Sequence, residues 1–285
     1  MADLTQVRLV DDDGTGLEVL RLDDSIGVVV TSCDLGFPEV RTVSNARPGQ
    51  NGTNDSTTYY GARSVTVTVL MPAVGWYIVE DALRAALSPR SRFYLYVLRD
   101  GWTDERRMLV RGAGFTPQTD VRSPQAQLQW VGTDGYMEES PDQVGLVPIF
   151  SGAEGGVTSP FSTPVAFQPG FNPGASTIQV DGTEDTAPVA TIYGPCTNPV
   201  LVLGGDSPQT LAFNMTIADG DYLFVDFAAR TALLNNNPIL SQYGYLDFTR
   251  SSWWSLPPGS QTVAFNPAQA SGGSQAVLSW RPRYI

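Results

Sequence analysis

The sequence contains no histidine and no lysine, so all 17 of its cationic side chains are arginines. Without histidine, the chain can build neither Ser-His-Asp or Cys-His catalysis nor a His-ligated zinc site. Without lysine, it has no Walker-type phosphate loop and no Schiff-base chemistry. Arginine stays protonated and is a poor general base. We therefore expect no catalytic residues, no cofactor and no cofactor-binding residues: the protein is predicted not to be an enzyme.

Charge and hydropathy restrict the partners. The formal net charge is −12, which argues against nucleic acid or an anionic membrane as partner. The first residues, 1–6, lack the basic and apolar regions of a secretory signal, and no apolar run approaches the length of a membrane span. With 42% hydrophobic residues in 285, the composition is that of one large or two ordinary globular domains.

Cysteine and acidic residues offer no metal site. Only Cys33 and Cys196 are present; we expect two separate buried thiols, because they fall in different predicted domains. The acidic run that begins at Asp11 fits the first ligand positions of a calcium loop, with Gly16 at the glycine position. The twelfth position, however, is Leu22, where a bidentate Glu is required. The run is therefore interpreted as a solvated turn between two short strands, and no metal ligand is predicted.

A long polar stretch, Arg47 to Met71, has two parts. Its first half is rich in Pro, Gly, Asn and Asp, which favour turns over regular structure. Its second half alternates strictly, with Val65, Val67 and Val69 on one face, which predicts a strand with one buried face. Two interpretations of the loop stay open: a simple surface hairpin, or a loop that a rigid sheet holds out to contact a partner.

The rest of the first half predicts strands and one helix. Trp76, Val79, Leu83 and Leu87 recur at helical spacing, which predicts a helix over about 76–88, ended by Pro89. Aromatic residues on both faces of Phe93 to Leu98 indicate a strand that is covered on both sides. A β-barrel or sandwich with one packed helix is the expected architecture.

A domain boundary is predicted near residue 145. Glycine and proline interrupt the patterns from Glu138 to Pro164, and 13 of the 17 arginines precede residue 123, leaving 17 − 13 = 4. Residues 1–140 and 145–285 are therefore expected to form two domains. The second holds only short strands with turns between them, which indicates a β-sandwich or jelly roll. The expected strands are 165–167, 177–180, 189–193, 199–203, 210–216, 221–226, 231–234, 261–265 and 276–280.

The order of several short motifs over nearly the whole chain resembles the distal tail proteins of long-tailed, non-contractile (siphovirus-type) bacteriophages. The motifs of the first half are Val30 to Arg41, the loop from Arg47 to Asp55, Tyr60 to Arg63, the helix, and Ala126 to Trp130. Those of the second half are Gly220 to Asp226, Arg230 to Asn235, Trp253 to Phe265 and Ser279 to Tyr284. Each motif is weak alone, and their order and spacing carry the resemblance.

The resemblance implies a structural protein of the virion, located at the phage tail tip and assembled in the host cytoplasm. Its N-terminal domain would close with five further copies into a hexameric ring, and its C-terminal domain would be a galectin-like sandwich outside that ring. The implied partners are the tail tube protein, the tail-tip hub or tail-associated protein, and the tape-measure protein. Arg41, Arg47 and Arg63 flank the long loop and could pair with acids of the next subunit, although a solvated surface is the simpler expectation.

Two other functions are compatible with parts of the sequence. A carbohydrate-binding adhesin that attaches to the host surface could stack sugars on Trp253, Trp254, Tyr243 and Tyr245, with Asp247 or Asn235 to Asn237 as hydroxyl partners. The same aromatic residues could instead fill a sandwich core, and we favour that interpretation. A glycosidase is disfavoured, because no Glu follows residue 184 and the later Asp residues lie mainly in turns.

Overall fold

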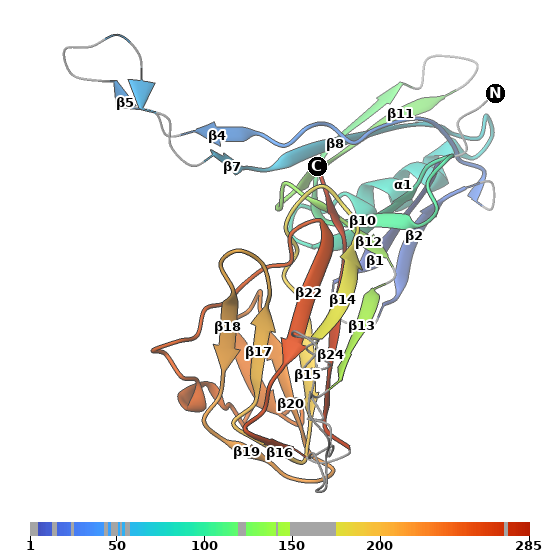
Figure 1. Ribbon diagram of the computed structural model, residues 1–285. Helices are drawn as coiled ribbons and strands as arrows, with labels where there is room; N and C mark the ends of the chain where they lie inside the picture. The colour runs from blue at the N-terminus through green and yellow to red at the C-terminus, as the bar shows by residue number, and fades with distance from the viewer. Residues whose placement is uncertain are drawn as a thin grey trace, which may run out of the picture. The chain divides into compact units, whose positions relative to one another are not determined.

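The computed structural model divides the chain into two compact units: unit 1 is Met1–Pro141 with Tyr284–Ile285, and unit 2 is Asp142–Arg283. Both units consist mainly of β-strands (Figure 1), which confirms the predicted fold class. Among the helices that the structure describes, none is long and apolar enough to cross a membrane. The described residues are 5–12, 16–23, 26–42, 45–46, 51, 53–54, 58–118, 124–140, 142–148, 175–270 and 273–285.

Unit 1 contains one long sheet, with strand order β2-β1-β9-β10-β11-β8-β3 and with β12 paired to β10. Two further strand pairs, β4 with β7 and β5 with β6, lie outside this sheet. The elements are β1 (Gln6–Asp11), β2 (Glu18–Leu22), β3 (Val29–Asp34), β4 (Val40–Thr42), β5 (Asn45–Ala46), β6 (Thr53–Asn54), β7 (Thr58–Tyr60), β8 (Arg63–Leu70), α1 (Trp76–Ala86), β9 (Phe93–Leu98), β10 (Glu105–Gln118), β11 (Gln125–Gly132) and β12 (Met137–Ser140).

Strand β10 is shared by two groups of strands. Its first half pairs with β9 and β12, and its second half pairs with β11. The register shifts between Gly112 and Gly114, and such a bulge bends a strand and increases its twist. The sheet therefore folds over its own core, while β2 and β3 remain its two ends. The described strands form an open, folded sheet and not the closed barrel that was one of the two predicted forms.

The core of unit 1 follows the alternation in the sequence. Val65, Val67 and Val69 of β8 are fully buried, as predicted. They pack in one cluster with residues of the neighbouring strands, including Leu128 and Trp130 of β11. The period of two in the valine run therefore determines which face of β8 points inward.

Helix α1 begins after Gly75 and ends before Leu87, close to the predicted bounds. Leu83 and Ala86 are buried in the core, and Trp76 packs against it. A single amphipathic helix thus covers part of the open sheet. The end of the helix approaches β10 so closely that a Cβ atom on Gly112 would overlap the backbone of Leu87.

This close approach predicts that Gly112→Ala lowers the free energy of unfolding by about 1–3 kcal/mol, the usual cost of overpacking. Chemical denaturation of the purified chain would measure the change. Gly114→Ala on the same strand is the matched control, because the nearest atom to its Cβ is the movable side-chain oxygen of Gln129. A Gly112 variant as stable as the Gly114 variant would contradict the packing described above.

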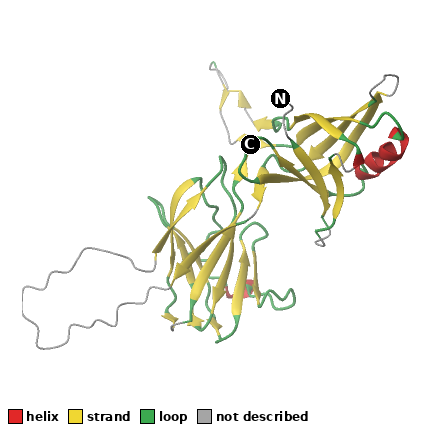
Figure 2. Ribbon diagram, turned by 90° about the vertical axis from the view of Figure 1, so that its right-hand side faces the viewer, coloured by secondary structure: helices red, strands yellow, loops and turns green. Residues whose placement is uncertain are grey.

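Unit 2 is a sandwich of two antiparallel sheets (Figure 2), with strand orders β13-β24-β15-β20-β21 and β14-β22-β17-β18. A small sheet, β19-β16-β23, adds to it. The elements of unit 2 are β13 (Gln143–Pro148), β14 (Ala175–Val180), β15 (Val189–Tyr193), β16 (Cys196–Thr197), β17 (Val200–Leu203), β18 (Gln209–Ala212), β19 (Thr216–Ile217), β20 (Tyr222–Asp226), β21 (Thr231–Leu234), the 3-10 turn η2 (Tyr243–Tyr245), β22 (Gly259–Phe265), β23 (Gln269–Ala270) and β24 (Gln275–Trp280). The short strand β25 (Arg283–Tyr284) pairs with β12.

Most predicted strands of the second half are present, with three differences. The predicted strand 210–216 is divided into β18 and β19, and strands β12 and β13 occupy part of the stretch that was interpreted as an interruption. The predicted strand 165–167 lies outside the described residues. Asn235 and Asn236 form the turn after β21, and both have positive φ (54° and 52°), which asparagine tolerates.

Candidate assembly surface

The face of the unit 1 sheet that points away from the core carries charged and aromatic side chains. Arg8 lies between the buried Val7 and Leu9 of β1, and Tyr96 follows the buried Leu95 of β9. Because successive side chains of a strand alternate between faces, Arg8 and Tyr96 lie on the outer face. The sequence predicted a strand covered on both sides at β9; its outer face is covered by arginine side chains and not by a second layer.

The strand register aligns five of these residues in one line across the sheet. Arg21 of β2 is paired with Arg8 of β1, Arg8 with Tyr96 of β9, Tyr96 with Arg107 of β10, and Arg107 with Glu138 of β12. We call these five residues the charged row. Cations, an aromatic ring and a carboxylate thus follow one another over five strands, at the spacing where cross-strand side chains interact.

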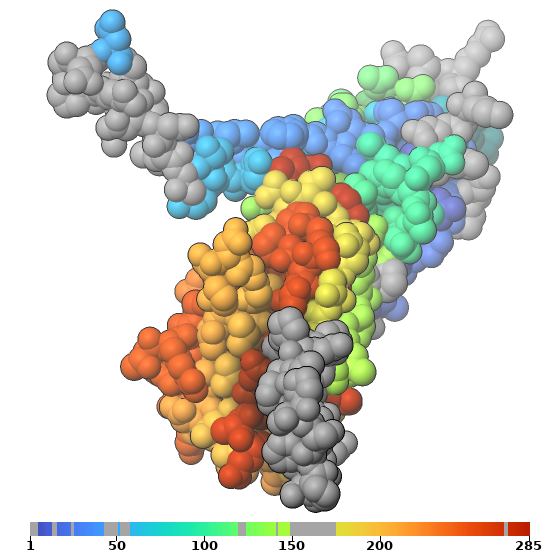
Figure 3. All heavy atoms as spheres, viewed as in Figure 1, coloured from blue at the N-terminus to red at the C-terminus, as the bar shows by residue number. Residues whose placement is uncertain are grey.

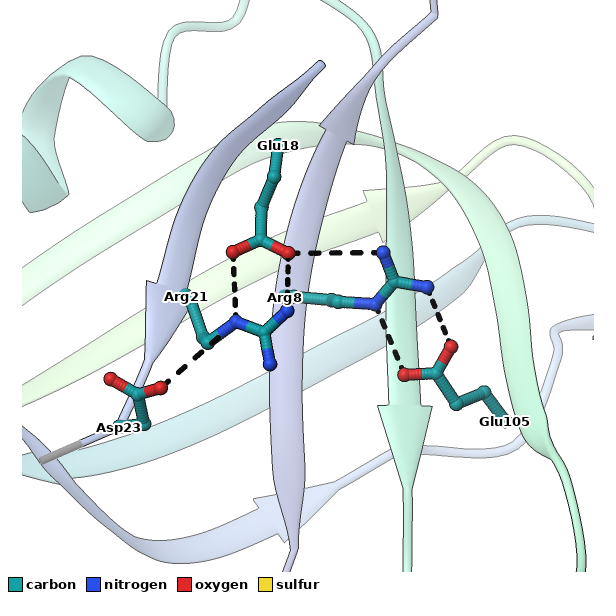
Figure 4. Close-up of polar contacts among 5 residues, drawn as sticks. All are labelled: Arg8, Glu18, Arg21, Asp23 and Glu105. Atoms are coloured by element: carbon teal, nitrogen blue, oxygen red, sulfur yellow. Dashed lines mark hydrogen bonds and ion pairs between the residues drawn. The ribbon is translucent and has the colours of Figure 1, made fainter. Parts of the chain in front are cut away.

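Carboxylates beside the charged row neutralise its arginines (Figure 4). Arg8 donates two hydrogen bonds to Glu105, at 3.0 Å from Nε to Oε1 and 2.6 Å from Nη2 to Oε2. Glu18 accepts two from Arg21, at 2.8 and 2.6 Å, and its Oε2 lies 3.8 Å from Nη1 of Arg8. Asp23 extends the network at 4.0 Å from Nε of Arg21. Paired hydrogen bonds of this kind hold both partners in a fixed geometry.

Two arginines of the charged row also pack against aromatic rings. Cζ of Arg8 lies 4.2 Å from the ring centre of Tyr96, and Cζ of Arg107 lies 4.5 Å from that of Tyr94. The hydrogen bonds that Arg8 donates to Glu105 raise the pKa of Arg8, and those that Arg21 donates to Glu18 lower the pKa of Glu18. Both changes favour the charged forms of Arg8 and Glu18.

A second surface of unit 1 is apolar and exposed. Strands β4 and β7 pair only with each other and run out from the sheet as a two-stranded ribbon (Figure 1), which we call the arm. Its atoms form a ridge that is one strand pair wide (Figure 3). Val40 is 50% exposed, Tyr59 61%, and Phe37 at its base 67%. A ribbon of two strands is barely stable alone in water, so a covering partner would stabilise it.

The three arginines that flank the long loop differ in their surroundings. Arg41 is exposed and pairs with Glu39 at 3.4 Å, while Arg47 lies outside the described residues. Arg63 is only 2% exposed, which corrects the expectation of a solvated side chain. Its position on β8 has the same parity as Val65, so the alternation that buries the valines buries this arginine as well.

The aromatic residues proposed for sugar stacking divide between the core and the surface of unit 2. Trp254 is 2% exposed and packs on Phe227, with ring centres 4.3 Å apart. Trp253 packs against the same core. Tyr243 and Tyr245 are 42% and 52% exposed, and the Tyr243 ring lies nearly parallel to Trp253. The core interpretation therefore holds for the tryptophans and not for the tyrosines.

The polar groups proposed to bind sugar hydroxyls have bonding partners within the chain. Asp247 accepts hydrogen bonds from the backbone and hydroxyl of Thr249 and pairs with Arg250 at 2.9 Å. The bonds from Thr249 lower the pKa of Asp247. Asn235 accepts a hydrogen bond from the backbone of Tyr222 and donates one to Asp221. Asp247 thus holds its own loop, and Asn235 connects the turn after β21 to the start of β20.

The cysteines and acids of the described residues show no metal cluster. Neither Cys33 nor Cys196 forms a disulfide. Burial raises the pKa of Cys196 to about 11, so its thiol stays protonated at neutral pH. Within the described ranges, no three His, Cys, Asp or Glu side chains are placed to hold a metal ion.

Comparison with known proteins finds a phage tail family that matches part of the chain, and solved structures that share its fold. Residues 181–284 match a family described as the C-terminal domain of a siphovirus-type tail component. The crystal structure of the Dit protein (gp 19.1) of phage SPP1 matches with a TM-score of 0.66 and 12% identity, over 98% of this chain and 99% of that one. Two baseplate structures of phage P2, with calcium and with strontium, match at 11% identity with TM-scores of 0.49 and 0.45, over 98% and 97% of this chain and 98% of each of theirs. No curated protein matches the sequence.

The resemblance to the siphovirus distal tail proteins is thus confirmed. The family match supports it over residues 181–284, and the likeness to SPP1 Dit extends the shared fold to nearly the whole chain. The sequence had indicated the family but not the charged row. Arg and Tyr residues on the outer faces of the predicted strands are visible in the sequence, but only the strand register shows that they align across the sheet.

The network around the charged row predicts a measurable coupling between Arg8 and Glu105. A double-mutant cycle with Arg8→Met and Glu105→Gln should give an interaction free energy of about 0.5–1.5 kcal/mol, because the pair is bidentate and both side chains are under 30% exposed. Chemical denaturation of the four proteins measures it. The control cycle is Arg41→Met with Glu39→Gln, where both side chains are over 60% exposed and the expected coupling is near zero. Equal coupling in the two cycles would refute this account of the network.

Proposed function

We propose that this chain is a non-enzymatic hub protein of a siphovirus tail. Six copies of it form a ring at the distal end of that tail. The ring joins the tail tube to the tail-tip or baseplate hub proteins and lies beside the tape-measure protein, as part of a virion assembled in the host cytoplasm. SPP1 Dit, which shares the fold, is described as a paradigm of the hub adsorption apparatus of phages that infect Gram-positive bacteria. Unit 1 is the ring-forming domain in this proposal, and unit 2 is a galectin-like domain outside the ring.

The arm is the single observation that carries this proposal. Its strands pair with no further strand among the described residues. Val40 is paired with Tyr60 and Tyr59 with Arg41, so the exposed side chains of Val40 and Tyr59 lie on opposite faces of the ribbon. A partner that wraps around the arm would cover both apolar side chains. The arm of one copy would contact a different surface on the next copy, so the contact would be heterologous. Heterologous contacts close into a ring when the rotation between neighbouring copies allows it.

The charged row has a different role in the proposal. Its charges are neutralised within one subunit, so it needs no partner and would contribute little to association. It fixes the register of five strands and keeps that face of unit 1 hydrated. The closure free energy would then come from apolar contact at the arm and from strand edges.

Native mass measurement tests the ring. The expected mass is 6 × 30.7 = 184.2 kDa for the purified chain, with the hub protein added if the ring requires a template. The double variant Val40→Thr and Tyr59→Thr should shift the mass to 30.7 kDa, because threonine keeps the strand propensity of the arm and removes most of its apolar surface.

Leu146→Thr is the matched control, because Leu146 is also an exposed strand residue (54%) but belongs to unit 2. This variant should keep the mass of the wild-type assembly. If the wild-type chain stays monomeric even with the hub protein, the ring proposal is wrong. If the arm variant assembles normally, the arm is not the contact.

A second candidate is attachment to a host-surface carbohydrate through unit 2. The observation in its favour is the exposed ring of Tyr243, which Trp253 supports at a centre distance of 6.4 Å and Phe248 flanks at 5.5 Å. A supported and exposed aromatic face is suited to the apolar side of a sugar. The hydrogen bonds that Asp247 and Asn235 make within the chain count against a sugar site, because these two side chains are already engaged.

A glycan array tests this candidate. Specific binding that Tyr243→Ala reduces at least tenfold would favour the adhesin. The control is Tyr193→Ala, which removes an exposed tyrosine (38%) from β15. Absence of binding to every glycan, or equal loss in both variants, would exclude a sugar site at Tyr243.

A further inference from the structure

Four side-chain nitrogens of the described unit 1 are sealed from solvent without a hydrogen-bond partner, and two of them, on Arg63 and Trp130, belong to residues that are almost fully buried. Arg63 is 2% exposed, and its Nε is sealed from solvent without a hydrogen-bond partner. Trp130 is 0% exposed, and its indole Nε1 is sealed and unpaired in the same way. Buried polar groups almost always find a partner, and a buried charge without one is costly to the folded state.

The register places the two donors close to each other. Arg63 of β8 is paired with Gly132 of β11, and Val65 is paired with Trp130. Arg63 and Trp130 are therefore diagonal neighbours on the inward face of adjacent strands, a separation that long and aromatic side chains span. Gly132 has no side chain, and the sulfur of Met108 lies 2.9 Å from the position that a Cβ on Gly132 would take.

Arg63 differs from the other arginines with sealed nitrogens in unit 1. Cζ of Arg106 lies 4.1 Å from the Trp102 ring centre and 3.4 Å from that of Tyr284. Arg107 pairs with Glu138 at 3.2 Å. For Arg63, burial lowers the pKa, and within the described ranges no carboxylate pairs with it. Among the described residues of unit 1, Arg63 is thus the buried arginine that neither stacks on an aromatic ring nor pairs with a carboxylate.

We propose that unit 1 binds a small monovalent anion, of the size of chloride or formate, between Arg63 and Trp130. Such an anion accepts hydrogen bonds from both N–H groups and supplies the missing negative charge. Arg63 and Trp130 are both buried, so the ligand must be small. Among the described residues no carboxylate pairs with Arg63, so a negative ligand would supply its counter-charge. The proposal concerns the single chain and does not depend on ring formation.

Calorimetry with exchanged anions tests this site. The full chain is melted in sodium gluconate, whose anion is too large for the site, and in sodium chloride at equal ionic strength. The wild-type transition of unit 1 should rise by about 2–4 °C in chloride, because a ligand that binds only the folded state stabilises it. Arg63→Met should show no chloride-specific shift, and in gluconate it should melt at or above the wild type, since it removes an uncompensated buried charge.

Arg41→Met is the matched control, because it removes an exposed arginine near the same strand and should keep the full chloride shift. Equal shifts in the wild type and in Arg63→Met would overturn the proposal. So would a strong loss of stability of Arg63→Met in gluconate, which would reveal an internal partner for the arginine.

Diffraction from wild-type crystals grown in bromide gives an answer even if Arg63→Met does not fold. An anomalous peak within hydrogen-bonding distance of the Arg63 guanidinium and Trp130 Nε1 is the expected result. Peaks only at surface positions, or a water molecule at the site, would overturn the proposal.

Discussion

Strand β10 is the element on which unit 1 depends, because it belongs to two groups of strands at once. Its first half continues the strands that carry the charged row, and its second half continues β11 and β8. The bulge at Gly112 bends it between these two roles, and the missing Cβ at the same residue lets the end of α1 approach. Sheet curvature and helix packing therefore rest on one glycine.

Two surfaces follow from this framework, and they suit opposite tasks. The charged row is neutralised within one subunit by Glu18, Glu105 and Glu138, so it is stable in water without a partner. The arm exposes apolar side chains on a strand pair that joins no further sheet among the described residues, and such a ribbon is barely stable alone in water. The proposed assembly would use both properties: a face that resists non-specific contact, and one that specifies contact.

The sequence predicted elements whose pattern is local. The valine run of β8 and the helical spacing of α1 predicted the buried faces correctly. The side-chain periods of a strand (2 residues) and of a helix (3.6 residues) can be recognised from residues close together in the sequence. Cross-strand relations were not predicted, because they depend on register. Arg63 was expected in solvent because it is charged, although its parity with Val65 already placed it inside. The hydrogen bonds of Asp247 within its loop, and of Asn235 to Asp221 and Tyr222, could be seen only in the structure.

Hydrogen exchange at the arm tests the central claim, that the arm is covered on assembly. Backbone amides of β4 and β7 would be compared between the dissociated chain and the assembled ring or tail tip, with those of β15 in unit 2 as the internal reference. The account predicts fast exchange at the arm in the dissociated chain and at least tenfold slower exchange in the assembly, with β15 unchanged. Equal exchange at the arm in both states would contradict it, because a covered ribbon cannot exchange as freely as an exposed one.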